Sequence, residues 1–197
     1  MSDARLAVWT ALALCVGCAK KQEPAQNGAP VGVMKDGKEG LAAFFAASHA
    51  ACTGKDFKKG RELALSVIPT KEQLAKILKE DVAAAQLDKL VDQYKEMPQT
   101  DEAAACIFYP GQGRTQITVH ASSVEDLAAY KEGTPSFEEF PGGARKLAET
   151  YLRPGRTFYE VEVTEPGKDT GTKFHLFFWD GTGWRMLGPA WRVLRAE

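Results

Sequence analysis

The C-terminal third of the chain alternates apolar and polar residues with a period of two, and this pattern constrains the fold more than any other feature. Residues 157–165, 172–179 and 184–187 follow the pattern, and Pro166–Gly171 and Asp180–Gly183 separate them. Alternation of this kind predicts half-buried strands, and short segments rich in Gly and Asp predict the turns between them. The sequence therefore predicts an antiparallel meander of three strands.

One register satisfies both hairpins of this meander, in which Glu165 pairs with Thr172 and Trp179 pairs with Trp184. In this register both faces of the sheet are rich in apolar groups, so we expect both faces to be covered or one to line a pocket. One face would carry Tyr159, Val161, Val163, Phe174, Leu176 and Phe178. The other would carry Glu160, Glu162 and His175 beside Phe177, Trp179 and Trp184.

Helical patterns precede the sheet. Apolar residues on one helical face predict a helix from Glu39 that stops at Gly54, and a second helix over residues 57–68. Thr70 and Gln73 form a capping box that opens a third helical stretch, whose pattern resumes after a polar break at Glu80-Asp81 and ends at Pro98.

Shorter elements fill the middle of the chain. Residues 104–109 and 114–121 are expected to be strands joined by a turn at Pro110–Gly113. A capping box of Ser122 with Glu125 predicts a short helix, and a last helix is expected over residues 144–152. The predicted fold class is α+β, with N-terminal helices packed on a C-terminal antiparallel sheet in a single domain of residues 39–197.

Helices followed by an antiparallel sheet that ends in the hairpin Asp180-Gly181-x-x-Trp184 resemble the NTF2-like cone fold. The resemblance would span residues 39–197. It implies a pocket between a curved sheet and its helices, and such pockets serve enzymes and binding modules alike.

The first eighteen residues resemble the export signal of a bacterial lipoprotein. An uncharged, largely apolar run follows Arg5 and ends in Cys15-Val16-Gly17-Cys18. The run is too short to cross a bilayer of about 30 Å as a helix. Its last four residues resemble a lipobox, although Cys15 stands where that motif usually has Leu. The resemblance implies that residues 1–17 are a signal peptide and that Cys18 becomes the acylated N-terminus. A plain signal peptide or an uncleaved anchor is the alternative.

The predicted location follows from this leader. Residues 18–38 are expected to be a flexible, lipidated tether, because the segment has little to pack. We therefore expect an exported protein that the lipid on Cys18 anchors to the membrane of the bacterial cell envelope. Ala19 favours the outer membrane in a two-membrane bacterium. The 25 Lys+Arg against 26 Asp+Glu show no basic excess, so nucleic acid is not expected as a partner.

Cys52 and Cys106 are the cysteines that remain after the leader, and in an oxidising compartment such a pair predicts a disulfide. Two buried free thiols are the alternative. His49 lies three residues before Cys52, a spacing that could support a Cys–His nucleophile or half of a zinc site. A complete site would need Cys106 and His120 to converge on it. The sequence has no second motif of paired ligands, and a disulfide would use both thiols. For these two reasons we predict no metal site and no cofactor.

Glu160, Glu162 and His175 are the candidate catalytic residues, because a carboxyl in an apolar wall has a raised pKa and an adjacent imidazole can exchange a proton with it. An ordinary cross-strand Glu–His pair, worth a few tenths of a kcal/mol, is the alternative. The candidate ligand-binding residues are Phe177, Trp179 and Trp184. Trp191 joins the tryptophans that crowd the C-terminus, where core packing explains them equally well.

The sequence contains no phosphate-binding loop, nucleophile elbow, zinc-protease motif or paired Cys-x-x-Cys motifs. It favours a lipid-anchored envelope protein with a non-enzymatic domain that binds a small ligand or an envelope partner. The alternative is an NTF2-like enzyme that uses Glu160, Glu162 and His175 in an aromatic pocket.

Overall fold

A four-stranded antiparallel sheet organises the computed structural model, which describes residues 34–82, 84–111 and 113–194. Its strands lie side by side in chain order: β1 (Gln116–Ser123), β2 (Thr157–Thr164), β3 (Gly171–Trp179) and β4 (Trp184–Met186). The last three strands confirm the predicted meander, and helices pack on the sheet as the predicted α+β class requires. The lipobox-like residues, Cys18 and most of the expected tether lie outside the described residues.

Three groups of helices accompany the sheet. Those before β1 are α1 (Lys38–Thr53), α2 (Phe57–Ser66), α3 (Lys71–Ile77), α4 (Ala84–Asp92), η1 (Gln93–Glu96) and α5 (Asp101–Ala105). Those between β1 and β2 are α6 (Val124–Ala129), α7 (Pro135–Glu138) and α8 (Gly142–Thr150), and η2 (Ala190–Arg192) follows β4. Within the described ranges, no helix is long and apolar enough to cross a membrane.

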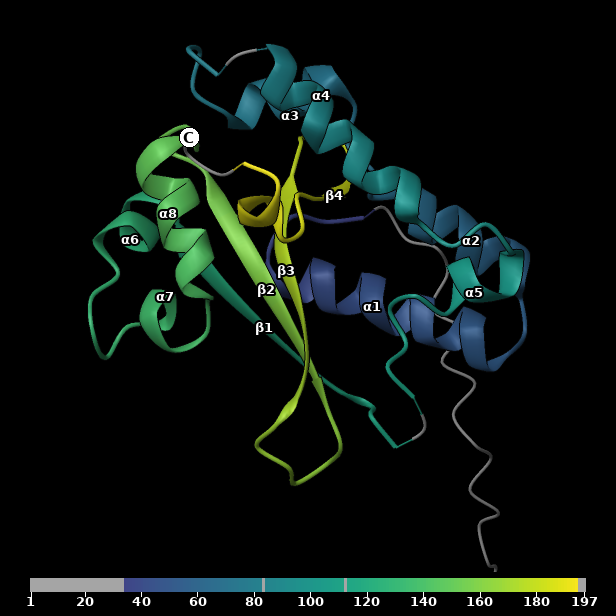
Figure 1. The fold of residues 1–197 in the computed structure, drawn as a ribbon. Coiled ribbons are helices and arrows are strands. Elements are labelled where there is room, and N and C mark those ends of the chain that lie inside the picture. The colour runs from purple at the N-terminus through teal and green to yellow at the C-terminus, as the bar shows by residue number, and fades with distance from the viewer. Residues whose placement is uncertain (1–33, 83, 112, 195–197) are drawn as a thin grey trace, which may run out of the picture. The chain divides into compact units, whose positions relative to one another are not determined.

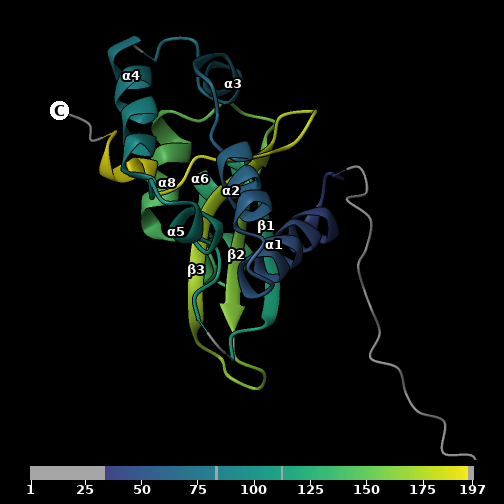
Figure 2. The same ribbon diagram turned by 90° about the vertical axis from the view of Figure 1, so that its right-hand side faces the viewer.

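Both faces of the sheet are covered, as expected from the apolar groups on both. Figure 1 shows α1, α2 and α5 on one side of the strands and α6, α7 and α8 on the other, and Figure 2 shows α1 and α2 in front of the strands. The α1 face buries Leu41, Phe45 and Phe108 against Val161 and Phe177. The α8 face buries a separate set of side chains that includes Leu147, Leu152, Phe158, Leu176 and Phe178.

Local signals account for several element boundaries. Gly54 caps α1, and the capping box of Thr70 with Gln73 opens α3, as predicted. The cap of α6 is Ser123, whose side chain accepts a hydrogen bond from the Asp126 amide, so the prediction of Ser122 was wrong by one residue. Ser122 and Ser123 are adjacent, and the one that caps α6 depends on where β1 ends, which is at Ser123.

The prediction of a strand over residues 104–109 was wrong. Thr100 caps α5, which ends at Ala105, and a turn follows. A short apolar run does not distinguish a strand from a buried helix by its period, and here the cap at Thr100 determines the outcome. Strand β1 therefore pairs with β2, and not with residues 104–109.

The predicted register of β2 against β3 was also wrong. Val161 pairs with Phe174, and the register then shifts so that Tyr159 pairs with Phe177. Two residues of β3, His175 and Leu176, thus stand opposite Glu160 alone. Such a β-bulge inserts one extra residue and changes the face to which the following side chains point.

The bulge exchanges the faces of the residues that follow it. Leu176 has a φ of +54°, in the left-handed region, and its side chain is buried on the α8 face with Phe178. Phe177 lies on the α1 face with Tyr159. The β3–β4 hairpin keeps the predicted pairing of Trp179 with Trp184.

Candidate functional site

Glu160 and His175 form a hydrogen-bonded pair on the α8 face of the sheet, with 2.5 Å between Glu160 Oε1 and His175 Nδ1. The Glu160 side chain is fully buried, whereas that of His175 is 26% exposed. Burial raises the pKa of Glu160, against the opposing effect of His175. Glu160 Oε2 is buried and has no hydrogen-bond partner among the described groups. The structure therefore pairs His175 with Glu160, whereas the predicted register placed His175 opposite Glu162, and the Glu160 carboxyl is screened from solvent.

The bulge in β3 positions this pair, because it places His175 directly across from Glu160. The Trp191 ring of η2 covers His175, with 5.3 Å between the ring centroids. Trp191 approaches α8 so closely that a Cβ on Gly143 would lie 2.3 Å from the indole. The aromatic partner of the pair is thus Trp191, and a glycine in α8 makes room for it.

Glu162 lies apart from this pair. It stands opposite Thr118 of β1 and opposite Lys173 of β3. Its carboxylate, one oxygen of Glu139 and a ring nitrogen of His120 all lie within 4.8 Å of one another. We call these three residues the His120 cluster. The sequence does not predict the cluster, because it pairs residues 114–121 with residues 104–109 and carries no signal that brings Glu139 next to β1.

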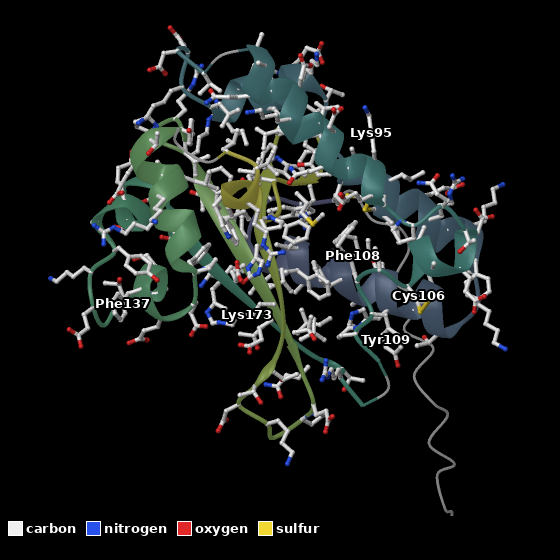
Figure 3. All side chains as sticks on the ribbon, in the orientation of Figure 1. Lys95, Cys106, Phe108, Tyr109, Phe137 and Lys173 are labelled. Carbon is white, nitrogen blue, oxygen red and sulfur yellow. A yellow bond between two sulfur atoms is a disulfide. The ribbon has the colours of Figure 1, made fainter. Side chains whose placement is uncertain are left out.

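Lys173 contacts the His120 cluster from β3, and Figure 3 shows it beside the strands on the side of α7. Its ammonium donates to Glu139 Oε2 at 2.9 Å and to the Glu139 carbonyl at 3.2 Å. Burial acts to raise the pKa of Glu139, but the hydrogen bond from Lys173 and the charge of His120 together hold it below its ordinary value. Glu139 is therefore held as a carboxylate at neutral pH.

The predicted aromatic pocket beside the Glu–His pair was wrong. Phe177, Trp179 and Trp184 lie on the α1 face, with the sheet between them and Glu160. Phe177 and Trp184 are completely buried, and the Trp184 ring packs edge-on against Tyr159 with 5.0 Å between centroids. The bulge is the reason, because it turned Phe177 to the other face. These aromatics serve the core of the α1 face.

A disulfide joins Cys52 to Cys106, as predicted. It connects α1 to the C-terminal end of α5, and not to a strand, because residues 101–105 are helical. His49 binds the Phe108 carbonyl through Nε2 at 2.7 Å. Burial lowers the pKa of His49, against the smaller effect of that carbonyl. The disulfide uses both thiols, so the alternative of a zinc or thiol site with His49 does not hold.

A cleft of about 610 Å³ opens near η1, β4 and η2. Four charged side chains line it, namely Lys89, Asp92, Glu96 and Arg192, together with the apolar side chains of Met97, Ile107, Met186, Pro189 and Val193. Its volume lies in the range of small-molecule sites. None of Glu160, Glu162 and His175 lines it. The residues that line the cleft come from segments far apart in the sequence, so no local motif could predict it.

No family model, curated protein or solved structure matches this chain. The resemblances to lipoprotein signals and to the NTF2-like cone fold therefore stay predictions. The candidate groups within the described residues are the buried Glu160–His175 pair, the His120 cluster, the disulfide and the cleft.

Proposed function

We propose that this protein is exported, anchored to the bacterial cell envelope by lipid on Cys18, and works there as a non-enzymatic binding domain. The binding site that we assign is the cleft near η1, β4 and η2. Its occupant is a small ligand with an apolar body, or an apolar side chain of an envelope partner.

The cleft is the observation that carries the binding function. Met97, Ile107 and Met186 are half-buried apolar side chains on its lining. Methionine side chains are unbranched and adapt to the shape of what they contact. Both Lys89 and Arg192 and the acidic Asp92 and Glu96 line it, so polar groups of either charge on the occupant can be matched.

The disulfide supports the proposed location. Disulfides persist in oxidising compartments and are rare in the reducing cytosol. The bond between Cys52 and Cys106 therefore suits a domain that folds outside the cytoplasm, where the lipoprotein-like leader would deliver it. A lipid anchor with several acyl chains gives stable attachment, which one chain alone does not.

The enzymatic alternative finds less support. A general base must come within hydrogen-bond reach of its substrate. Glu160 is completely buried beneath the helices of the α8 face, and Glu162 belongs to a different cluster. Neither lines the cleft. Binding at the cleft therefore explains the arrangement better than acid–base chemistry does.

Fluorescence of the dye anilinonaphthalene sulfonate tests the cleft. We expect the folded full chain to bind the dye and Met97→Arg to weaken that binding several-fold, because a charged side chain would occupy the apolar lining. Leu65→Arg is the matched control, since Leu65 is an exposed apolar residue (42%) outside the lining. Equal dye binding by the wild type and Met97→Arg, with both folded by circular dichroism, would remove the cleft as the binding site.

Intact-mass analysis of protein extracted from membranes tests the anchor. We expect a chain that begins at Cys18, carries acyl groups and lacks the two hydrogens that a disulfide removes. Cys18→Ala should retain its leader and carry no acyl group. A wild-type chain that keeps Met1 without any fatty acid would refute the proposed location and leave the cleft to be judged by its own experiment.

A further inference from the structure

The His120 cluster brings one nitrogen and two carboxylates together from three different segments. His120 lies on β1 and Glu162 on β2. Glu139 is the residue that follows α7, a helix that packs against β1. Their ligand atoms all lie within 4.8 Å of one another. Strand pairing fixes the first two, because Glu162 stands opposite Thr118, two residues from His120 on the same face of β1. The convergence is therefore a product of the tertiary fold.

Within the part of the chain that the structure describes, His120 Nε2 is buried and lacks a hydrogen-bond partner. Its nearest carboxylate oxygen, Glu139 Oε2, lies 3.6 Å away, which is too long for a hydrogen bond. Two ligands that each lie about 2.1 Å from a tetrahedral zinc ion are about 3.4 Å apart. The observed separation of His120 Nε2 from Glu139 Oε2 is close to that value, and it also meets the distance of an ion pair.

We propose that His120, Glu139 and Glu162 bind one Zn²⁺ ion. Imidazole and carboxylate are both ligands of zinc, and the charges of two carboxylates balance that of the ion. Three protein ligands leave a fourth position for water or for a group of another molecule. The zinc site is independent of the cleft, because none of its three residues lines the cleft. It is also independent of the proposed lipid anchor at Cys18.

The Lys173 ammonium would compete with a metal ion for Glu139. It donates a hydrogen bond to Glu139 Oε2, the same oxygen that faces His120. The Lys173 side chain is 29% exposed, so its head can move into solvent on its flexible stem. Zinc binding would therefore displace the ammonium from Glu139, and a neutral side chain at this position would remove the competition.

Isothermal titration calorimetry with Zn²⁺ tests the proposal on the full chain, purified without a histidine tag. The chain carries Cys15→Ser and Cys18→Ser, because Cys15 and Cys18 have the Cys-x-x-Cys spacing and their free thiols would bind zinc themselves. We expect one ion per chain. His120→Ala and Glu162→Gln should each weaken binding at least about tenfold, and Lys173→Gln should strengthen it.

Glu165→Gln is the matched control, because Glu165 is an exposed residue just beyond the end of β2 and outside the cluster. It should bind zinc as the parent does. Metal-free unfolding midpoints show which variants fold, and Glu162→Gln keeps the shape of the half-buried side chain. The proposal is overturned if the parent binds no zinc, if His120→Ala binds it as tightly as the parent, or if only Lys173→Gln binds it.

Discussion

Glu160 is the residue at which burial and charge conflict most strongly. Its side chain is completely buried, one carboxylate oxygen contacts His175, and the other has no partner among the described groups. An ionised carboxyl in such a place loses its hydration and recovers only part of that stabilisation from the His175 imidazole and the Leu176 backbone. The raised pKa of Glu160 is the direct result.

Glu160→Gln should change how stability depends on pH. The folded pKa of Glu160 lies above its ordinary value of 4.5, so between these two values the folded state binds more protons than the unfolded state. The unfolding free energy of the wild type should therefore fall, relative to Glu160→Gln, as the pH rises above 4.5. Urea unfolding from pH 4 to pH 8 measures this difference.

Glu165→Gln serves again as the control, because the same substitution at an exposed carboxyl should leave the pH profile close to that of the wild type. A constant difference between Glu160→Gln and the wild type over the whole range would show that Glu160 has the same pKa in both states. The amide that Glu160→Gln introduces can still form a hydrogen bond with His175, which should keep the absolute difference within about 1–3 kcal/mol.

At the scale of elements, the β3–β4 hairpin depends on Asp180. Its Oδ1 accepts hydrogen bonds from the Thr182 amide and hydroxyl and from the Gly183 amide. Its Oδ2 accepts from Gln73 of α3 and lies 3.0 Å from a guanidinium nitrogen of Arg185. One carboxylate thus shapes the turn and ties α3 to the sheet. Burial acts to raise the pKa of Asp180, and the bonds from Thr182 and Gly183, with Arg185, hold it lower.

Asp180→Ala should destabilise the fold by about 3 kcal/mol at pH 7, because it leaves several donors of the turn without their charged acceptor. The lowered pKa means that this contribution is present above the ordinary value of 3.8 and is lost as the pH falls through the folded pKa. Urea unfolding at pH 7 and pH 3 measures both effects. Asp169→Ala, at an exposed position in the β2–β3 connection, should stay within about 0.5 kcal/mol of the wild type.

The elements with strong periodic patterns could be predicted, and those whose partners depend on the tertiary fold could not. The meander, α1 and the capping box at Thr70 follow from local spacing and side-chain chemistry. The bulge did not follow, because Leu176 is a leucine in the left-handed region, where a local rule expects glycine or asparagine. Burial of its side chain on the α8 face offsets that strain.

The same bulge explains what could be predicted of the site. Glu160 and His175 were named from their strands, and the structure brings them together. Their aromatic neighbours were misassigned, since a shift of one residue moves every later side chain to the other face. His120, Glu139 and Lys173 came together only through the pairing of β1 with β2 and the return of the chain after α7, which no local pattern encodes.

At the scale of the whole molecule, the disulfide joins the first helix to the segment that leads into the sheet. Cys52 and Cys106 are 54 residues apart, and closing a loop of that length restricts the unfolded chain strongly. The double substitution Cys52→Ser/Cys106→Ser should therefore lower the unfolding free energy by about 4 kcal/mol. Urea unfolding of the oxidised wild type, the reduced wild type and the double variant measures it.

Reduced wild type and the double variant should unfold alike, because both lack the same covalent constraint. A reduced protein as stable as the oxidised one would mean that the fold gains nothing from the bond. That result would also weaken the case for an extracytoplasmic domain, since a fold that does not need its disulfide is equally suited to a reducing compartment.

The bond has a second consequence, for how the chain responds to a protease. Any single backbone cut between Thr53 and Ala105, for example in the exposed connection after α3 at Glu80 and Asp81, falls inside the covalent ring. Both fragments would stay attached, and the nicked chain would run as one species on a gel until a reductant separated it into two.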